Sequence, residues 1–558
     1  MNDSPRLHLL LSHFDDGEPV LKDGLPEEAA AEVEREPPAA EQGPQDFWEE
    51  GGDPGDLEEQ RWGVLAPEGP EGDRLLALIR PLMELRREQQ GGHDIQIYRV
   101  PPRLSPADAA RWRKANFDTQ SDVSTDLPRY QLLLGDLPQM PLSVQQCQSS
   151  DGFVGRLCFR EDREYEAYVD KVLRWENARV STPPRAKFFT VHDGTAATMM
   201  GYRALMKPGI DILNSRQQPV EDLGNMDSPS PSEFLEMARD PTPTMLFSVS
   251  HGAGAPRGGW KSFEEQRDRQ GALSFGREGK LAGDDLDDGP FLPNGVWFML
   301  ACYGAGTPDV SAYRHWLEKL KSVGQFGGNA QAVLAGLPAG DTPPFIARLP
   351  QRALANPNGP LAVMGHIDLA WTYSFEERDS GKKPVNRPGK FMDIVRSALR
   401  GERSGISFRQ LVRFIGHANQ ELSDLYDLAE REGDAHMVDK ARLGHLWMLR
   451  QDMMGYVLLG DPAVRLPALK TKPKTQAVDS AAPEQAKAPL QVFASPAPVA
   501  KAPTLPIPLD QLEEAIGHLL AGELAPKAVA NKFAIDRAEL ERLTDLYRKA
   551  GRAALGEK

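Results

Sequence analysis

Two reactive side chains follow short apolar runs in the same way. His251 follows the run in FSVSHGAG, which begins at Phe247, and Cys302 follows the run in FMLACYGAG, which begins at Phe298. Small residues come soon after each, and a glycine beside a reactive group lets a peptide backbone approach closely. A thiol paired with an acid–base group attacks amide carbonyls when hydrogen-bond donors await the oxyanion. The pattern predicts a Cys–His pair for amide chemistry.

The elements around this pair predict an α/β fold. From about residue 75 to 466, apolar runs of strand length end at Gly, Asp or Pro and alternate with helical stretches. Such strands indicate a mainly parallel sheet covered by helices on both faces. Reactive groups collect at the carboxyl ends of strands in these sheets, where His251 and Cys302 are expected to lie. We expect strands at 130–137, 185–191, 244–250, 295–301, 331–337 and 359–367, and helices over 161–178 and 311–323.

The rest of the chain of 558 residues consists of segments that differ in composition. Residues 1–60 hold 18 Asp and Glu against 3 Lys and Arg, within a net charge of −16. We predict that residues 1–72 form an acidic, mostly disordered segment, because their Glu, Pro and Gly content provides little apolar surface to bury. A linker rich in Pro and Ala is expected over 467–507, followed by a small all-α unit over 508–558.

Several other classes of protein are disfavoured. The three cysteines, Cys147, Cys158 and Cys302, lack metal-ligand spacing, so neither a disulfide framework nor a metal site is predicted, and no cofactor is expected. No run approaches the roughly 20 apolar residues of a membrane span. The apolar run at the start is too short for a secretory signal, and we expect a cytoplasmic protein without a membrane partner. GAPRGGWKS departs from a phosphate loop, and no G-x-S-x-G serine elbow occurs.

The two reactive blocks resemble a known family. SVSHGAG and FMLACYGAGTP are similar to the catalytic blocks of the caspase-like (clan CD) cysteine peptidases, with bacterial gingipain-like (C25-type) and CHAT-type proteins most similar. Three further segments also resemble this family: YQLLLGDLPQMP, GPLAVMGHIDLAWTYSF and YVLLGDPAVRLP. The resemblance therefore covers roughly 125–466. It implies a caspase-like, mainly parallel sheet flanked by helices in two subdomains. The first, non-catalytic one would span 75–240 and the catalytic one 241–466.

The resemblance also implies roles for the reactive residues. Cys302 would be the nucleophile, and His251 would protonate the departing amine and later help water to attack the thioester. The backbone amides of Gly252 and Cys302 would form the oxyanion hole. A fixed third acid is not expected, because this family generally works with a dyad.

Three further residues are candidates for substrate binding. Asp368 and Trp371 follow a strand that borders the specificity pocket in this family, and Asp193 lies just past another apolar run. An acid at Asp368 or Asp193 would favour Arg or Lys before the scissile bond. The alternatives stay open: Asp193 can be a helix N-cap, and Asp368 can be a capping or salt-bridged residue.

Two functions of different classes follow. The first is a cysteine endopeptidase that cleaves a protein or peptide through a thioester and is regulated by a partner or by processing. The acidic N-terminal segment would then be an inhibitory or processed piece, or alternatively a solubilising tail. The second is a non-catalytic caspase-like scaffold that acts through residues 508–558, whose rhythm resembles a helix-turn-helix. Residues 505–558 carry 8 Lys and Arg against 9 Asp and Glu, so a protein partner is favoured over nucleic acid.

Overall fold

The computed structural model describes residues 6–33, 52–118, 127–176, 178–223, 229–324, 326–377, 385–432 and 440–469. The chain divides into two units, Met1–Lys472 and Pro473–Lys558, and the described residues all belong to the first. The predicted helical unit at 508–558 and all but the first residues of the linker at 467–507 lie outside them.

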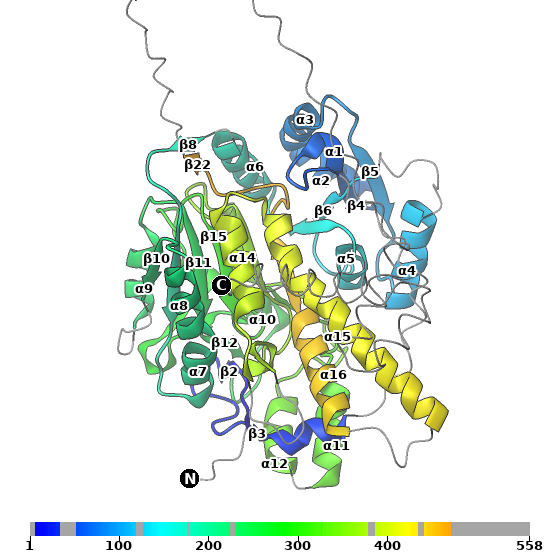
Figure 1. Cartoon of the computed structure of the whole chain (residues 1–558), viewed down its shortest axis with the longest axis vertical. Helices are drawn as coiled ribbons and strands as arrows, with labels where there is room; N and C mark the ends of the chain where they lie inside the picture. Colours follow the sequence, from blue (N-terminus) through cyan, green and yellow to red (C-terminus); the bar gives the residue numbers. More distant parts are fainter. Residues whose placement is uncertain are drawn as a thin grey trace, which may run out of the picture. The chain divides into compact units, whose positions relative to one another are not determined.

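A ten-stranded sheet forms the centre of the first unit, with helices on both faces (Figure 1). Neighbouring strands are parallel except β18 and β21, so the sheet consists of two parallel blocks that run in opposite directions. This confirms the expected mainly parallel α/β class. The order across the sheet is β10 (Val220–Asp222), β9 (Arg185–Thr190), β11 (Thr244–Val249), β15 (Val296–Leu300), β18 (Ala362–His366), β21 (Tyr456–Leu459), β7 (Phe153–Leu157), β6 (Tyr130–Leu134), β4 (Trp62–Pro67) and β5 (Gln96–Val100).

The antiparallel step places the subdomain boundary elsewhere than predicted. Strands β9 and β10 lie within 185–222 but share a block with β11 and β15, so they belong with the half that carries His251 and Cys302. Strand β21 comes late in the chain but lies beside β7, which it meets at Leu459 and Arg156. A division of the sequence at 240 therefore does not separate the two blocks of parallel strands. The chain enters the block that carries His251 and Cys302 before residue 240, and it returns to the other block with β21.

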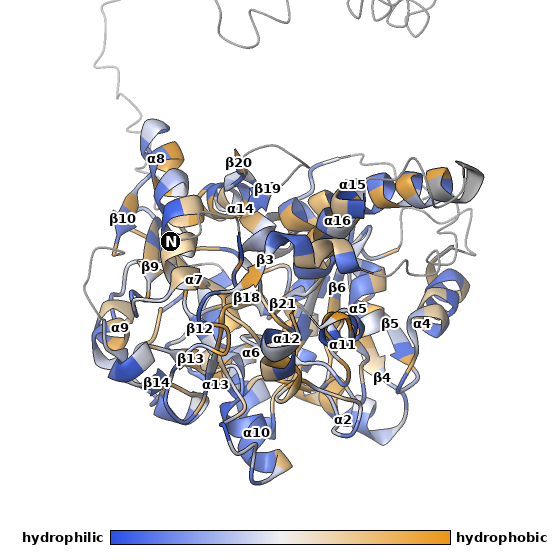
Figure 2. Ribbon diagram, turned by 90° about the horizontal axis from the view of Figure 1, so that it is seen from below, coloured by the Kyte–Doolittle hydropathy of each residue, from blue (hydrophilic) through white to orange (hydrophobic). Residues whose placement is uncertain are grey.

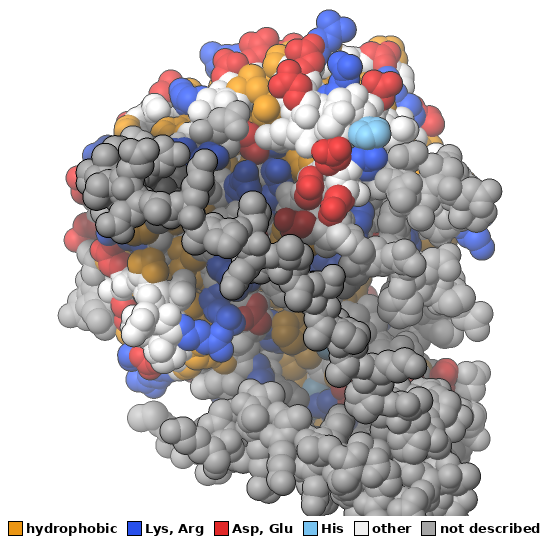
Figure 3. Space-filling model, turned by 45° about the horizontal axis from the view of Figure 1, so that its top comes forward, with side chains coloured by type: hydrophobic (Ala, Val, Ile, Leu, Met, Phe, Trp, Pro, Cys, Tyr) orange, Lys and Arg blue, Asp and Glu red, His pale blue; other side chains and the backbone are white. Residues whose placement is uncertain are grey.

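Helices cover both faces of this sheet. Figure 2 shows helix α10 on the outside with mostly hydrophilic residues, and charges of both signs are interspersed on the face in Figure 3. The expected helices at 161–178 and 311–323 are confirmed as α6 and α11. The longer helices are α2 (Pro70–Leu78), α3 (Arg80–Gln89), α4 (Pro106–Arg113), α5 (Leu142–Ser149), α6 (Asp162–Glu176), α8 (Lys207–Ser215), α9 (Pro231–Ala238), α10 (Phe263–Arg269), α11 (Arg314–Val323), α12 (Gly327–Leu334), α13 (Arg348–Ala355), α14 (Gly389–Leu399), α15 (Ser404–Glu432) and α16 (Lys440–Met454).

One predicted strand is wrong. The run QAVLAGL at 331–337 was expected to be extended, but its first residues complete helix α12. The buried residues Ala330, Val333 and Leu337 are spaced three and four apart, which is the helical period. Alanine, glutamine and leucine also favour helix over strand.

The acidic N-terminal segment is more ordered than expected. Strands β1 (Arg6–Leu7), β2 (Leu11–His13) and β3 (Leu25–Pro26) and the 3-10 helix η1 (Glu27–Glu32) belong to the fold, as do residues 52–72. Strand β2 is the edge of a small sheet with the order β14 (Lys280–Leu281), β13 (Leu273–Ser274), β12 (His251–Gly254), β2. The leucines of RLHLLLSH are buried, and they provide the apolar area that the acidic stretches after them lack.

Candidate active site

Strands β11 and β15 bring the histidine and the cysteine to the same level of the sheet. They are parallel neighbours with Val249 opposite Leu300, so His251 and Cys302 come two residues later on each. A Cβ on Gly252 would lie 1.8 Å from the Cys302 carbonyl oxygen, so only glycine permits this approach. The predicted pair is therefore brought together.

A sharp turn follows the cysteine. Tyr303 has φ of +57°, a left-handed conformation that costs energy for a large side chain. The amide of Gly304 donates to the Ala301 carbonyl at 3.2 Å, which closes the turn around Cys302. The Tyr303 amide donates to the Asp368 carbonyl at 2.9 Å, so the turn is also fixed to the loop after β18.

The histidine is oriented from one side. Its Nε2 lies 2.9 Å from the Thr195 hydroxyl, which in turn donates to Asp193 Oδ1 at 2.7 Å. Asp193 Oδ2 lies 3.5 Å from the same ring nitrogen. Because the hydroxyl donates its own proton to Asp193, the Thr195 oxygen can accept a hydrogen bond from Nε2–H. That tautomer leaves Nδ1, which is buried and without a hydrogen-bond partner among the described residues, free to accept a proton.

Asp193 thus lies behind the histidine. It is not the N-cap that the sequence left open, since Thr195 caps helix α7 (Ala196–Met200). Thr195 itself was missed, because a threonine that caps a helix has no distinguishing local signal. Burial lowers the pKa of His251, and Asp193 partly opposes this effect.

The cysteine thiol lies beside the loop after β18. Cys302 Sγ accepts a hydrogen bond from the Ala370 amide at 3.1 Å and lies 3.6 Å from the Ala370 carbonyl oxygen. The thiol is fully buried, and this burial raises its pKa well above its ordinary value. The thiol is therefore neutral at physiological pH in this arrangement.

The two amides predicted for the oxyanion hole point at one oxygen. Gly252 N and Cys302 N lie 2.9 Å and 3.3 Å from the carbonyl oxygen of Leu10. Two backbone donors from different strands that share one acceptor have the geometry of an oxyanion hole. Leu10, the residue that fills it, was not among the predicted site residues.

Asp368 is buried and held within the protein. Its carboxylate accepts hydrogen bonds from Ser311 Oγ and Ala312 N, both at 2.8 Å, and from its neighbour Leu369 N at 2.8 Å. Burial nevertheless raises the pKa of Asp368 to about 6. This placement fits the alternative of a capping residue that fixes the turn at 311–312, and it does not favour a role in selecting Arg or Lys.

Trp371 pairs through its backbone with the N-terminal segment beside Cys302, and its ring packs in the core. Its indole packs against Tyr313 and Trp316, with ring centroids 5.9 Å and 5.7 Å away. Its amide donates to Asp452 Oδ1 at 2.9 Å, and burial raises the pKa of that carboxyl group to about 7. Trp371 also pairs with Leu9 in an antiparallel bridge, so its backbone borders the segment that fills the site.

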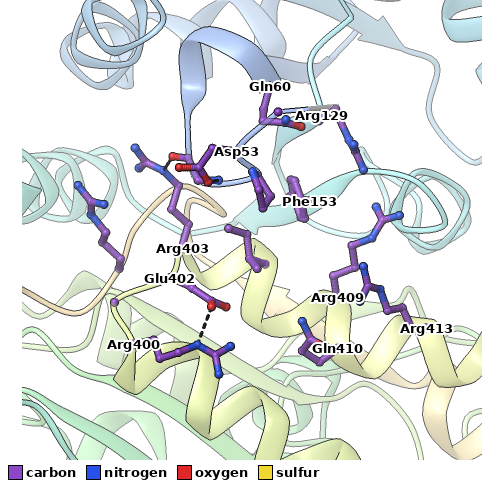
Figure 4. A pocket seen from close by; sticks show the side chains of 16 residues that line it. Asp53, Gln60, Arg129, Phe153, Arg400, Glu402, Arg403, Arg409, Gln410 and Arg413 are labelled. Atoms are coloured by element: carbon purple, nitrogen blue, oxygen red, sulfur yellow. Dashed lines mark hydrogen bonds and ion pairs between the residues drawn. The ribbon is translucent and has the colours of Figure 1, made fainter. Parts of the chain in front are cut away.

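A cavity lies elsewhere on the molecule and is not lined by His251 or Cys302. This cavity of about 520 Å³ is lined by six arginines, together with Asp53 and Glu402 (Figure 4). Because neither residue of the pair lines it, the cavity is not part of the candidate active site. The arginines are Arg129, Arg400, Arg403, Arg409, Arg413 and Arg465.

Two structural features are absent from the part of the chain that is described. No group of three or more His, Cys, Asp or Glu residues there is arranged to hold a metal ion. None of the helices described is long and apolar enough to span a bilayer.

Comparisons with known proteins are sparse. No family model matches the chain, and no curated protein matches it. Among solved structures it is similar to the Arg-specific cysteine proteinase gingipain R, at 12% identity and TM-score 0.40, covering 74% of this chain and 79% of that one. It is similar to a structure described only as a protease, at 11% identity and TM-score 0.43, covering 74% and 80%.

The complex of the pro- and mature domains of RgpB from Porphyromonas gingivalis is also similar, at 10% identity and TM-score 0.40, covering 73% of this chain and 80% of that one. All three TM-scores lie below 0.5.

Proposed function

We propose that the protein is a cysteine endopeptidase in which Cys302 and His251 form the catalytic dyad. The observation that carries this proposal is the convergence of Gly252 N and Cys302 N on a single peptide carbonyl oxygen. The thiol and the imidazole emerge from adjacent strands at the same level. A buried structural cysteine has no need of such a pair of donors.

In the proposed reaction, each of these groups has one role. Cys302 loses its proton to the unpartnered Nδ1 of His251, and the sulfur attacks the carbonyl carbon of the substrate. The two amides stabilise the oxyanion, and His251 returns the proton to the departing amine. Water then attacks the thioester with His251 as base, which releases the acid and restores the thiol.

The environment expected for the enzyme is part of the proposal. Its substrates are proteins or peptides, it acts in the cytoplasm without metal or cofactor, and residues 508–558 bind a protein partner. The alternative is a non-catalytic scaffold that acts through those residues. The complete burial of Cys302 is compatible with that alternative, so a direct test of turnover is required.

The test compares hydrolysis of fluorogenic peptides with Leu, Arg, Lys or Asp before the reporter. We expect Cys302→Ala and His251→Ala each to lower kcat/KM by about 10³-fold or more. Cys147→Ala and the exposed His417→Ala are matched controls, since both residues lie on helices away from the pair, and they should retain full activity. Equal turnover in Cys302→Ala and the wild type would disprove the dyad. Absence of both turnover and labelling of Cys302 by acyloxymethyl-ketone peptides would favour the scaffold.

A further inference from the structure

A segment from the N-terminus passes through the candidate active site as an extended strand. On one side it pairs with the loop after β18: Leu10 N donates to Ala370 O, and Thr372 N donates to His8 O, both at 3.0 Å. On the other side β2 pairs with β12 in parallel, with Leu11 opposite Gly252. Figure 1 shows β2 beside β12, although their residues lie far apart in the sequence.

The register of this strand places one peptide bond at the dyad. The Leu10 carbonyl oxygen accepts from both oxyanion-hole amides, and the Leu10 amide shares the acceptor Ala370 O with Cys302 Sγ. The carbonyl group of Leu10 is therefore held at its oxygen by the amides that flank the pair, with the thiol beside its amide. The bond between Leu10 and Leu11 is the one presented for attack.

The residues on both sides of that bond are apolar. The Leu10 side chain is completely buried within the main apolar core, and Leu11 is 5% exposed. A Cβ on Gly254 would lie 2.8 Å from Leu11 Cδ1, so Leu11 packs directly on β12. Of the two acids predicted to select a basic residue, Asp368 is committed to three internal donors, and Asp193 lies 3.5 Å from His251 Nε2. A cation at position 10 would lose its hydration without gaining the partner that Asp368 was expected to provide.

The segment after the bond is fixed to the protein. Asp16 forms an ion pair with Arg257 at 2.7 Å, and Val20 N donates to Leu11 O at 2.9 Å. Further along, Trp316 Nε1 donates to the Ala29 carbonyl oxygen at 2.9 Å, which anchors η1 against α11. These contacts maintain the register of Leu10 and Leu11 in the cleft and exclude an external peptide.

We propose, on the basis of the endopeptidase function above, that residues 7–12 are an internal substrate, that Cys302 cuts the Leu10–Leu11 bond, and that the enzyme selects an apolar residue such as leucine on the acyl side of the bond it cuts. Leu10 then marks the specificity position. Until the cut occurs, the strand occupies the site beside Cys302 and keeps external peptides out. The thiol is buried in this state, and its burial raises its pKa.

The cut is a hydrolysis and needs only water. Cys302 Sγ bonds to the Leu10 carbonyl carbon, the C–N bond to Leu11 breaks, and the Leu11 amine leaves with the proton that His251 took from the thiol. Water then adds its hydroxyl group to the Leu10 acyl carbon and a proton to the sulfur. The products are a peptide that ends in the Leu10 carboxylate and a chain that begins at Leu11.

The experiment follows this bond in the full-length protein. Wild type, Cys302→Ala, Leu10→Met and Leu10→Arg are incubated at pH 7.5 and analysed by intact mass and N-terminal sequencing. We expect a chain that begins at Leu11 in wild type and Leu10→Met, no cut in Cys302→Ala, and a cut slowed by about 10²-fold or more in Leu10→Arg, since an apolar pocket rejects an unpaired charge.

A second measurement covers the case in which Leu10→Arg displaces the strand. Wild type is given two reporters that copy the segment, Leu-His-Leu-Leu and Leu-His-Leu-Arg, each with a fluorogenic amide. We expect kcat/KM to be about 10²-fold higher for the first. A wild type that hydrolyses reporters yet stays intact at Leu10–Leu11, or that prefers the Arg reporter, overturns the inference while the peptidase stands. A protein that cuts neither itself nor any reporter, and whose Cys302 is not labelled, contradicts both.

Discussion

At the residue scale, a hydroxyl group places the histidine, and the acid to which it donates lies 3.5 Å from the same ring nitrogen. Thr195 Oγ1 lies between His251 Nε2 and Asp193 Oδ1, at 2.9 Å and 2.7 Å. In the proposed mechanism, this chain would fix the ring and favour the imidazolium that forms when the thiol gives up its proton. Thr195 and Asp193 would therefore be positioning residues.

Replacing Thr195 with valine should test this role. The substitution keeps the shape of the side chain and removes the acceptor for Nε2, so we expect kcat to fall by about 10-fold or more with little change in KM. Because the acceptor stabilises the protonated ring, its loss should lower the pKa of His251 further. The acidic limb of the kcat profile should therefore move to lower pH.

Thr198→Val is the matched control for this prediction. Thr198 Oγ1 also bonds to Asp193 Oδ1, at 2.8 Å, but the Thr195–His251 contact remains when that hydroxyl is removed. The control should retain most of kcat and an unshifted profile. Equal losses in the two variants would mean that Thr195 acts only through the stability of the loop at 193–198.

At the element scale, η1 holds the N-terminal segment against the helices near the cleft. A Cβ on Gly444 of α16 would lie 1.9 Å from the Ala30 carbonyl oxygen, so the two backbones are in direct contact. The strand in the cleft depends on this packing, because η1 and β2 belong to one short segment.

Gly444→Ala should loosen this segment. Overpacking of this kind costs about 1–3 kcal/mol, which would raise the population of molecules with an open cleft by roughly 5-fold or more. We expect faster alkylation of Cys302 by iodoacetamide, measured in a His251→Ala background to prevent turnover. Gly416→Ala on α15 is the control: apart from its chain neighbours and the nearby backbone of its own helix, no described atom lies within 4 Å of its Cβ, so only a gain in helix propensity follows. Unchanged alkylation in Gly444→Ala would show that η1 does not restrain the strand.

At the scale of the whole molecule, a buried charge network joins distant parts of the chain. Arg86 of α3 is fully buried and lies 2.7 Å from Asp461 Oδ2 and 3.1 Å from Glu176 Oε1 of α6. Trp62 Nε1 also donates to Asp461, at 3.0 Å. The network thus ties the end of the described chain to the first block of the sheet.

Arg86→Met should therefore be costly. Removing Arg86 leaves the buried Asp461 without its cation and leaves Glu176 with only the more distant Arg403, at 3.4 Å, at a cost of about 3–5 kcal/mol. We expect the Tm to fall by roughly 5–15 °C in calorimetry. Arg74→Met, which breaks an exposed contact with Glu71 and Asp162, should shift the Tm by only a few degrees. Similar shifts in the two variants would contradict a special role for the network.

The parts of this structure that follow local rules could be predicted from the sequence. His251 and Cys302 each follow a buried strand, and parallel strands place their carboxyl ends together. The exception among the strands, 331–337, is a short apolar run in which helical and extended patterns overlap.

The occupant of the cleft could not be predicted in the same way. Leu10 meets Gly252 and Cys302 across more than two hundred residues, and no local periodicity encodes such a pairing. The only signal was the apolar run in RLHLLLSH, which is unusual within an acidic segment. The role of Asp368 was equally hidden, since its partners Ser311 and Ala312 lie on another turn.

The covalent link across the cleft also has a consequence for competition. While residues 6–13 are one chain, the strand competes with any external peptide at an effective concentration that is in the millimolar range for short tethers. Cutting after Leu10 ends that advantage: the piece upstream becomes an ordinary ligand that is diluted into solution, while the piece downstream stays attached through η1. Before cleavage, an external peptide must compete with a tethered strand at high effective concentration. After cleavage of this single bond, binding of external peptides would depend only on their own affinity and concentration.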